Sequence, residues 1–124
     1  MPPFEKSPAA LIEMFNETMA GFPQVTLRRT FGYPCAYING HMAVGLFADT
    51  FFLRLSPMDE AEFLKLEDAT SFAPMVNRPM KGYVIVPYKI LGDIQQLGNW
   101  IARSLEFVSI LPPKEKKAAP KKRG

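Results

Sequence analysis

The sequence predicts an α+β domain in which helices pack on one face of an antiparallel sheet of about five strands. Three observations support this prediction. Short apolar segments between residues 26 and 55 are separated only by tight turns, of which Asn39-Gly40 is the strongest signal. Apolar residues at three- and four-residue spacing indicate a helix before these segments and another near the end of the chain. The β-branched segment 83–86 lies between two helical segments and predicts a further strand.

The first predicted element is a helix that follows the Ser-Pro pair at residues 7–8. Serine is a favoured N-cap, and proline suits the first helical turn because its missing N–H would have no partner there. Gly21 is expected to end this helix. Residues 25–31 alternate between apolar and polar side chains, which predicts a strand, and Gly32 with Pro34 predicts a bend or bulge after it.

Three more strands are predicted at residues 34–38, 41–47 and 50–55, each bounded by a turn signal. The Ser-Pro pair at residues 56–57 then combines an N-cap with a proline at the first helical position. It predicts a helix near residues 57–66. The side chains that we expect to point inward from this helix are Met58, Ala61, Phe63 and Leu64.

The last part of the chain predicts a strand at residues 83–86 and a long final helix. This helix is expected to start near Asp93, which forms a capping box with Gln96, and to end before the proline pair at residues 112–113. A connecting segment or a weak strand is expected near residues 71–75. The predicted order is therefore α-β-β-β-β-α-β-α, with the weak strand as an optional addition.

The length and the cysteine content predict one domain without an internal disulfide, because the chain has 124 residues and a single cysteine. We expect residues 1–6 to be disordered, residues 7–111 to form the domain and residues 112–124 to form a flexible basic tail. No apolar segment approaches the roughly 20 residues of a membrane-spanning helix, and no secretory signal is visible. The predicted location is cytoplasmic, without a membrane partner.

The positive charge of the chain is concentrated in the tail. Residues 114–124 hold six lysines and arginines and one glutamate, whereas the other residues carry a net charge of −2. Cations on a flexible segment bind nucleic acid without sequence preference, through counterion release. A purely solubilising tail is the equally weighted alternative. The candidate nucleic-acid-binding residues are Lys114, Lys116, Lys117, Lys121, Lys122 and Arg123.

A second set of cations lies within the predicted domain. If the sheet brings them together, arginines beside a tyrosine would bind a phosphate or a carboxylate, because the guanidinium fork matches both groups. The alternative is that these cations pair with the acids of the domain. The candidates for binding an anion or a partner are Arg28, Arg29, Arg78, Lys81 and Tyr83, with Arg54 and Tyr33 considered beside them.

The sequence favours a protein without catalytic, metal or cofactor chemistry. Cys35 and His41 are the only cysteine and histidine, so one chain cannot supply the four ligands of a structural zinc site. A nucleophile pair formed by these two residues across the intervening turn is the alternative to a packed thiol beside a turn histidine. Asp59, Glu60 and Glu62 fit the first turn of a helix better than acid–base catalysis.

Two aromatic residues of the final helix lie off its main apolar stripe. Trp100 and Phe107 are seven residues apart and either complete the core or form a surface for self-association. The second alternative predicts a homodimer.

Three segments, in this order and spacing, resemble the TfoX N-terminal domain family: FGYPCAYINGHMAVGL (31–46), FFLRL (51–55) and RPMKGYVIVP (78–87). The resemblance covers about residues 10–111 and continues into the final helix around Trp100. It implies a fold like that of the type III secretion chaperones, with helices on one face of an antiparallel sheet. It implies no catalytic residues.

The resemblance also implies a role and a class of partner. In the competence regulators of the family, this domain precedes a C-terminal helical domain, and the protein acts in transcriptional control. We expect the present chain to be a stand-alone, non-enzymatic regulatory or interaction domain with a protein partner in transcriptional regulation, aided by weak nucleic-acid binding of its tail. The alternatives are a protein-binding module without nucleic-acid function and a small-anion pocket near Arg78 and Tyr83.

Overall fold

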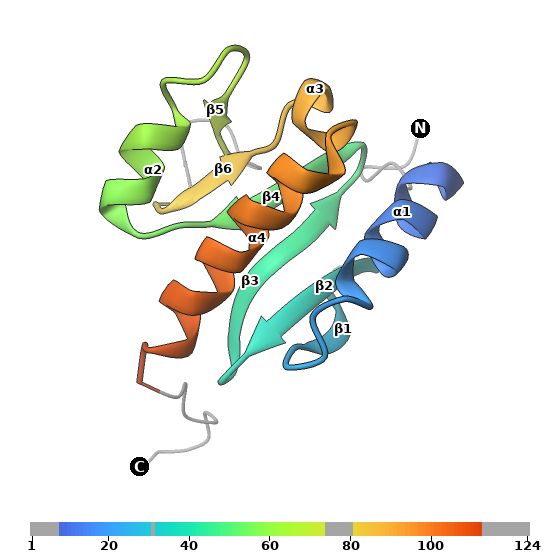
Figure 1. Cartoon of the computed structure of the whole chain (residues 1–124). Helices are drawn as coiled ribbons and strands as arrows, with labels where there is room; N and C mark the ends of the chain where they lie inside the picture. Colours follow the sequence, from blue (N-terminus) through green and yellow to red (C-terminus); the bar gives the residue numbers. More distant parts are fainter. Residues whose placement is uncertain (1–7, 31, 74–80, 113–124) are drawn as a thin grey trace.

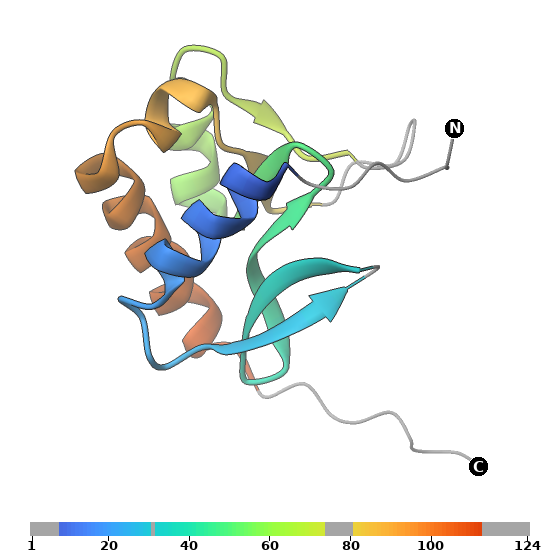
Figure 2. The same cartoon turned by 90° about the vertical axis from the view of Figure 1, so that its right-hand side faces the viewer.

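The computed structural model describes residues 8–30, 32–73 and 81–112. In this part of the chain, six strands form one antiparallel sheet, and the helices lie on one side of it (Figures 1 and 2). The strand order is β1-β2-β3-β4-β6-β5. The predicted α+β class is confirmed, with one strand more than the approximate number expected.

The first four strands form a meander that agrees with the sequence prediction. Asn39 and Gly40 join the second and third strands with φ angles of 53° and 80°, as a type I′ turn requires. Ala48, in the next turn, also has a φ of 53°. The strands of the meander are β1 (Thr26–Thr30), β2 (Tyr33–Ile38), β3 (His41–Phe47) and β4 (Thr50–Arg54).

The remaining strands are short and come from the second half of the chain. β6 (Tyr83–Ile85) pairs with β4, and β5 (Thr70–Ser71) pairs with the outer side of β6. The weak strand expected near residues 71–75 is therefore present, although it begins and ends earlier. It adds a strand to the predicted order, between the second helix and β6.

The helices are α1 (Ala9–Met19), α2 (Pro57–Phe63), α3 (Tyr88–Leu91) and α4 (Ile94–Ser109). Two predicted N-caps are confirmed. Ser56 Oγ accepts a hydrogen bond from the Asp59 N–H at 3.2 Å, and the Asp93 carboxylate accepts one from the Gln96 N–H at 3.1 Å. The one-turn helix α3 was not expected, because Ile90 continues the apolar spacing of α4 and therefore looked like its first turn.

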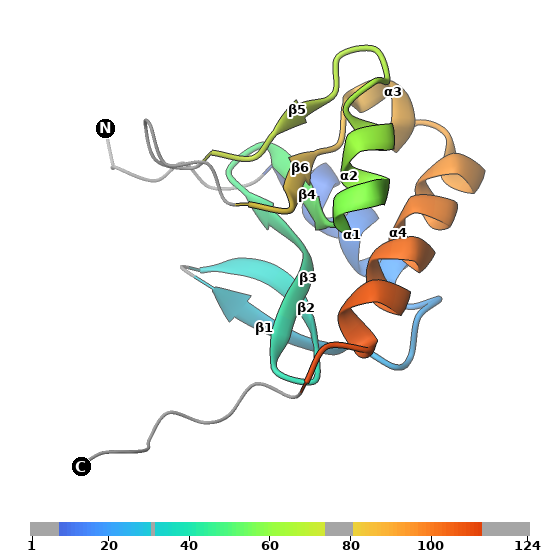
Figure 3. The ribbon, with the colours of Figure 1, turned by 90° about the vertical axis from the view of Figure 1, so that its left-hand side faces the viewer.

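The main core lies between the sheet and the helices. α1 and α4 pack across β2 and β3, with α4 also reaching β4, and all four helices lie on the same side of the sheet (Figure 3). Phe15 of α1 and Phe51 of β4 are buried with their ring centres 5.8 Å apart. Ile101 of α4 is buried in the same cluster. None of the described helices has the length and apolar character needed to cross a bilayer.

A β-bulge in β3 changes which side chains share a face of the sheet. The paired residues are Cys35 with Gly45, Ala36 with Val44, Tyr37 with Met42, and Ile38 with His41. Ala43 is thus an extra residue without a counterpart in β2. Its side chain and that of Val44 both belong to the main core, whereas Met42 packs on the other face.

Helix α4 contacts the bulge directly. Ser104 is a buried polar residue of this helix, and its hydroxyl donates a hydrogen bond to the carbonyl of Ala43 at 3.3 Å. The carbonyl of a bulged residue needs a partner when it is buried, because an unsatisfied polar group in the core is costly. The bend or bulge predicted near Gly32 and Pro34 is a turn between β1 and β2, whereas the bulge at Ala43 was not predicted. Gly32 has a φ of 85° in the β1–β2 turn.

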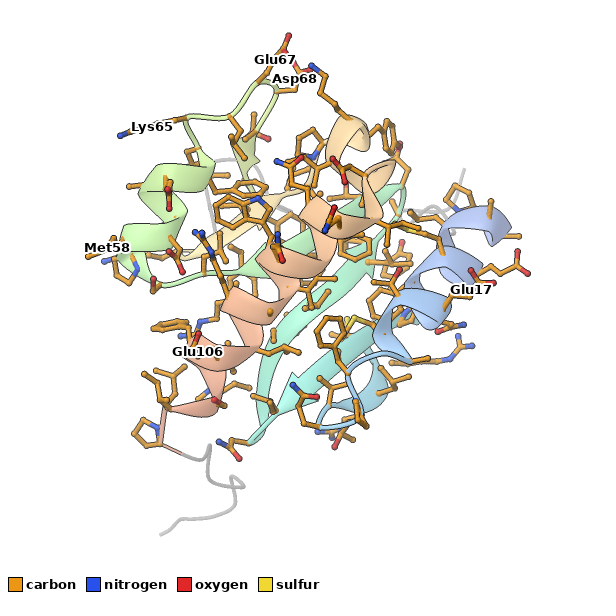
Figure 4. The ribbon with its side chains drawn as sticks, viewed as in Figure 1. Glu17, Met58, Lys65, Glu67, Asp68 and Glu106 are labelled. Carbon is orange, nitrogen blue, oxygen red and sulfur yellow. The ribbon has the colours of Figure 1, made fainter. Side chains whose placement is uncertain are left out.

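The inward face of α2 differs from the prediction. Phe63 is buried, but Met58 is 81% exposed and points into solvent (Figure 4), and Ala61 and Leu64 are exposed as well. The reason is that α2 has only seven residues and meets the rest of the core through its last residue. The ring of Phe63 lies edge-on against Trp100, with ring centres 4.9 Å apart.

Candidate functional site

The face of the sheet opposite the helices carries a second apolar cluster. Four of its side chains are buried, although the helices lie on the other side of the sheet. We call this surface the open face; it consists of Cys35, Tyr37, Met42, Phe47, Phe52, Phe72, Tyr83 and Ile85. The bulge places Met42 in this cluster, and the pairing of β4 with β6 adds Tyr83.

Aromatic rings of the open face pack on one another. Phe52 and Phe72 are stacked with their ring centres 4.5 Å apart, and Tyr83 lies edge-on to Phe52 at 5.8 Å. Both arrangements are favourable for aromatic pairs. The described rings of Phe52, Phe72 and Tyr83 therefore form one packed cluster on this face of the sheet.

Tyr83 connects the second half of the chain to the bulge. Its hydroxyl donates a hydrogen bond to the carbonyl of Met42 at 2.8 Å, so that β6 contacts β3 across β4. Burial raises the pKa of the Tyr83 hydroxyl, whereas the positive charge of Arg54 acts in the opposite direction. Tyr83 is therefore a neutral hydrogen-bond donor that fixes the local backbone.

Two arginines lie at the sides of this aromatic cluster. The guanidinium carbon of Arg28, on β1, is 4.9 Å from the ring centre of Tyr37. That of Arg54, at the end of β4, is 5.8 Å from the ring centre of Tyr83 and equally far from that of Phe107 on α4. Both distances are within the range of cation–π attraction. These contacts hold both guanidinium groups beside the rings, and Arg54 also forms a side-chain hydrogen bond with Tyr83.

The charges of the described residues are separated between the sheet and the helices. The strands contain three arginines (Arg28, Arg29 and Arg54) and no acidic residue. Acids instead occur on α1, α2 and α4, as Figure 4 shows for Glu17 and Glu106.

The ion pairs of the described residues use other cations. Lys89 pairs with Glu67 at 2.7 Å, and Arg103 pairs with Glu62 at 3.0 Å and with Asp59 at 3.5 Å. No described carboxylate forms an ion pair with the three arginines of the strands. Their positive charge is thus not neutralised by the acids that the structure describes.

The structure brings together some of the candidate residues and separates others. Arg28 and Tyr83 both contribute to the open face. Arg29 follows Arg28 on β1 and therefore points to the opposite face, where its guanidinium donates to the carbonyl of Gly32 at 3.2 Å. Lys81 is exposed, just before β6. Arg78 and the six tail candidates at positions 114–123 lie outside the described residues.

Tyr37 is a residue of this face that the sequence argument missed. Its hydroxyl forms a hydrogen bond with the hydroxyl of Thr30, and its ring lies under Arg28. The signal that would have identified it is the alternation of β2, because Cys35 and Tyr37 are two residues apart and so share a face.

The alternative of a Cys35–His41 nucleophile pair is wrong. Cys35 is opposite Gly45, whereas His41 is opposite Ile38, whose side chain packs in the main core on the other face. Cys35 is 1% exposed, and burial raises the pKa of its thiol. His41 Nε2 donates a hydrogen bond to the carbonyl of Pro112 at 2.7 Å. The thiol is a packed side chain, without the histidine contact that would activate it.

The described residues contain no group of three or more His, Cys, Asp or Glu side chains that could hold a metal ion. Together, the fold and this surface define a small α+β domain with one face of its sheet under helices and the other lined by aromatic and arginine side chains. The sequence model of the TfoX N-terminal domain matches residues 17–108. The chain belongs to this family, as the segments around residues 31–46 and 78–87 predicted.

Membership of this family indicates a regulatory or interaction domain, and the family is not known for an enzymatic activity. No curated protein and no solved structure matches the chain.

Proposed function

We propose that this chain is a non-enzymatic interaction domain that binds acidic groups of a protein partner at the open face, through Arg28 and Arg54. The observation that carries the proposal is that both guanidinium groups lie over aromatic rings and have no ion pair with a described carboxylate. An arginine held over a ring keeps its N–H groups for a carboxylate and loses little side-chain entropy on binding.

A protein partner fits this surface better than a small anion. The surface combines the stacked rings of Phe52 and Phe72 with arginines over Tyr37 and Tyr83. Aromatic residues and arginine are the residue types enriched at protein interfaces. The small-anion pocket considered near Arg78 and Tyr83 is less supported, because the hydroxyl of Tyr83 already donates to Met42.

We expect Arg28→Ala and Arg54→Ala each to weaken the binding of an acidic peptide about tenfold, since a hydrogen bond to a charged group contributes about 1.5–3 kcal/mol. The probe is a rhodamine-labelled (Gly-Glu)6 peptide, and the measurement is fluorescence anisotropy. Arg103→Ala is the matched control, because it removes the same charge from α4, where Arg103 already pairs with Glu62. Equal losses for all three variants would contradict the proposal and indicate a net-charge effect.

We also propose that the tail, residues 114–124, adds weak nucleic-acid binding without sequence preference. Its six cations against one acid support this role, because each neutralised phosphate releases counterions. The tail contains no aromatic residue to stack on bases.

Removing residues 114–124 is expected to lower the affinity for a 20-base-pair DNA duplex at least tenfold at low salt. The affinity of the full chain should fall with salt with a log–log slope of up to about −5, as expected for about six phosphate contacts. A full-length variant with the six tail cations replaced by serine controls for length and should behave like the truncated chain. DNA binding that survives both changes would refute the role of the tail.

A further inference from the structure

β1 is an edge strand of the described sheet. It pairs with β2 on one side, and no described segment pairs with its outer side (Figure 2). At the other edge, β5 has only two residues, whereas β1 has five. Alternate residues of an edge strand direct their N–H and C=O groups away from the sheet, where another strand can pair with them.

Most side chains of β1 are exposed, and two of them are positively charged. Residues 26–29 are all exposed, and Leu27 among them is 50% exposed. Arg28 lies on the open face, and Arg29 lies on the opposite face. A strand that pairs with the outer side of β1 would therefore lie beside Arg28 on one face of the sheet and beside Arg29 on the other.

We propose that β1 accepts an extended acidic segment of a partner protein as an additional strand of the sheet. This inference rests on the proposed function and names the form in which the acidic partner binds. Oppositely charged side chains directly across from each other stabilise a strand pair. Two consecutive acids, one for each face, match Arg28 and Arg29, and the backbone ladder supplies affinity as in other cases of β-augmentation.

Charge argues against one other occupant of this edge, and backbone hydrogen bonding argues against a second. In a second copy of the chain, antiparallel pairing centred on β1 would place Arg28 opposite its own counterpart, which is destabilising. Charged residues on an edge strand protect it from such pairing, but they favour an acidic strand. Nucleic acid carries the required charge, yet it lacks the alternating N–H and C=O groups that pair with a strand edge.

The test uses the full chain and a rhodamine-labelled peptide of sequence Thr-Val-Glu-Glu-Val-Thr, with affinity measured by anisotropy. Two further peptides carry N-methyl groups on one or the other alternate set of backbone amides. We expect one methylated peptide to lose at least tenfold in affinity and the other to bind like the parent, because only one set of amides faces β1.

Charge reversal on the protein side gives an independent readout. The double variant R28E/R29E should lose its affinity for the Glu-Glu peptide. It should instead bind the peptide in which both glutamates are replaced by lysines. Both positions are exposed, and circular dichroism verifies that the variant remains folded.

Three outcomes would overturn the inference. If both methylated peptides bind like the parent while Arg28→Ala and Arg54→Ala still weaken (Gly-Glu)6, then pairing at the edge is wrong and the proposed function stands. If the arginine substitutions weaken the binding of neither (Gly-Glu)6 nor the unmethylated Glu-Glu peptide, both proposals fail. If a chain without residues 114–124 binds DNA, and R28E/R29E abolishes that binding, then the edge is a nucleic-acid site.

Discussion

Replacing Gly45 by alanine is expected to destabilise the domain by about 2–3 kcal/mol, because it forces a methyl group into a filled part of the open face. A Cβ at this position would lie 2.6 Å from Phe52 Cζ and 2.7 Å from Cys35 Sγ. Neither neighbour has room to move, since Phe52 is stacked on Phe72 and Cys35 is buried. The strand must shift, and the aromatic cluster must shift with it.

Urea unfolding followed by circular dichroism measures this effect. Gly98→Ala is the matched control, because Gly98 lies within α4 and a Cβ there meets no atom within 4 Å. Alanine is a better helix former than glycine, so this variant should be more stable than the wild type by up to ~1 kcal/mol. The same substitution thus has opposite effects at the two positions. A Gly45→Ala protein as stable as the wild type would contradict the close packing of the open face.

Replacing Trp100 by alanine is expected to cost about 3–5 kcal/mol, the usual loss for a large buried aromatic residue. Trp100 is 7% exposed, its ring meets Phe63 edge-on, and the guanidinium carbon of Arg103 lies 4.7 Å from its ring centre. Its contact with Phe63 joins α4 to α2 through two aromatic rings. A loss of this size is a large part of the 5–15 kcal/mol that stabilises a typical domain.

Thermal unfolding followed by circular dichroism tests the role of Trp100. Ile94→Ala, on the same helix at a position that is 81% exposed, should change stability by less than about 0.5 kcal/mol. Trp100→Phe should lose less than Trp100→Ala, because it keeps a ring against Phe63. A small loss for Trp100→Ala would show that this side chain does not complete the core. Self-association of the chain stays a prediction in either case.

The parts of the fold that follow from neighbouring residues were predictable. The Asn39-Gly40 turn sets the β2–β3 hairpin, and the caps at Ser56 and Asp93 start two helices, because each of these features depends on contacts within a few residues. The β-branched residues at 83–86 predicted the strand β6, and the family segments agree with it. Local chemistry and resemblance therefore sufficed for the α+β class and for most element boundaries.

The parts that depend on distant residues were not predictable. Ala43 bulges out of register beside Ser104, which lies 61 residues further along the chain. Phe63 points inward, and Met58 does not, because the ring of Phe63 packs edge-on against Trp100. The candidate site was anticipated only in part for the same reason: Arg28 and Tyr83 were identified as single residues, but their common surface requires β6 to pair with β4.

The separation of charge between the two layers has a consequence for how the domain meets other molecules. Among the described residues, the arginines of the strands and the acids of α1 and α2 lie in different layers and contribute a dipole moment across the sheet. In the field of an acidic macromolecule, such a dipole rotates the domain before contact, so that collisions begin with the sheet side forward and productive encounters become more frequent. Added salt shortens the range of this alignment to about 8–10 Å, which makes the association rate, more than the lifetime of the complex, sensitive to ionic strength.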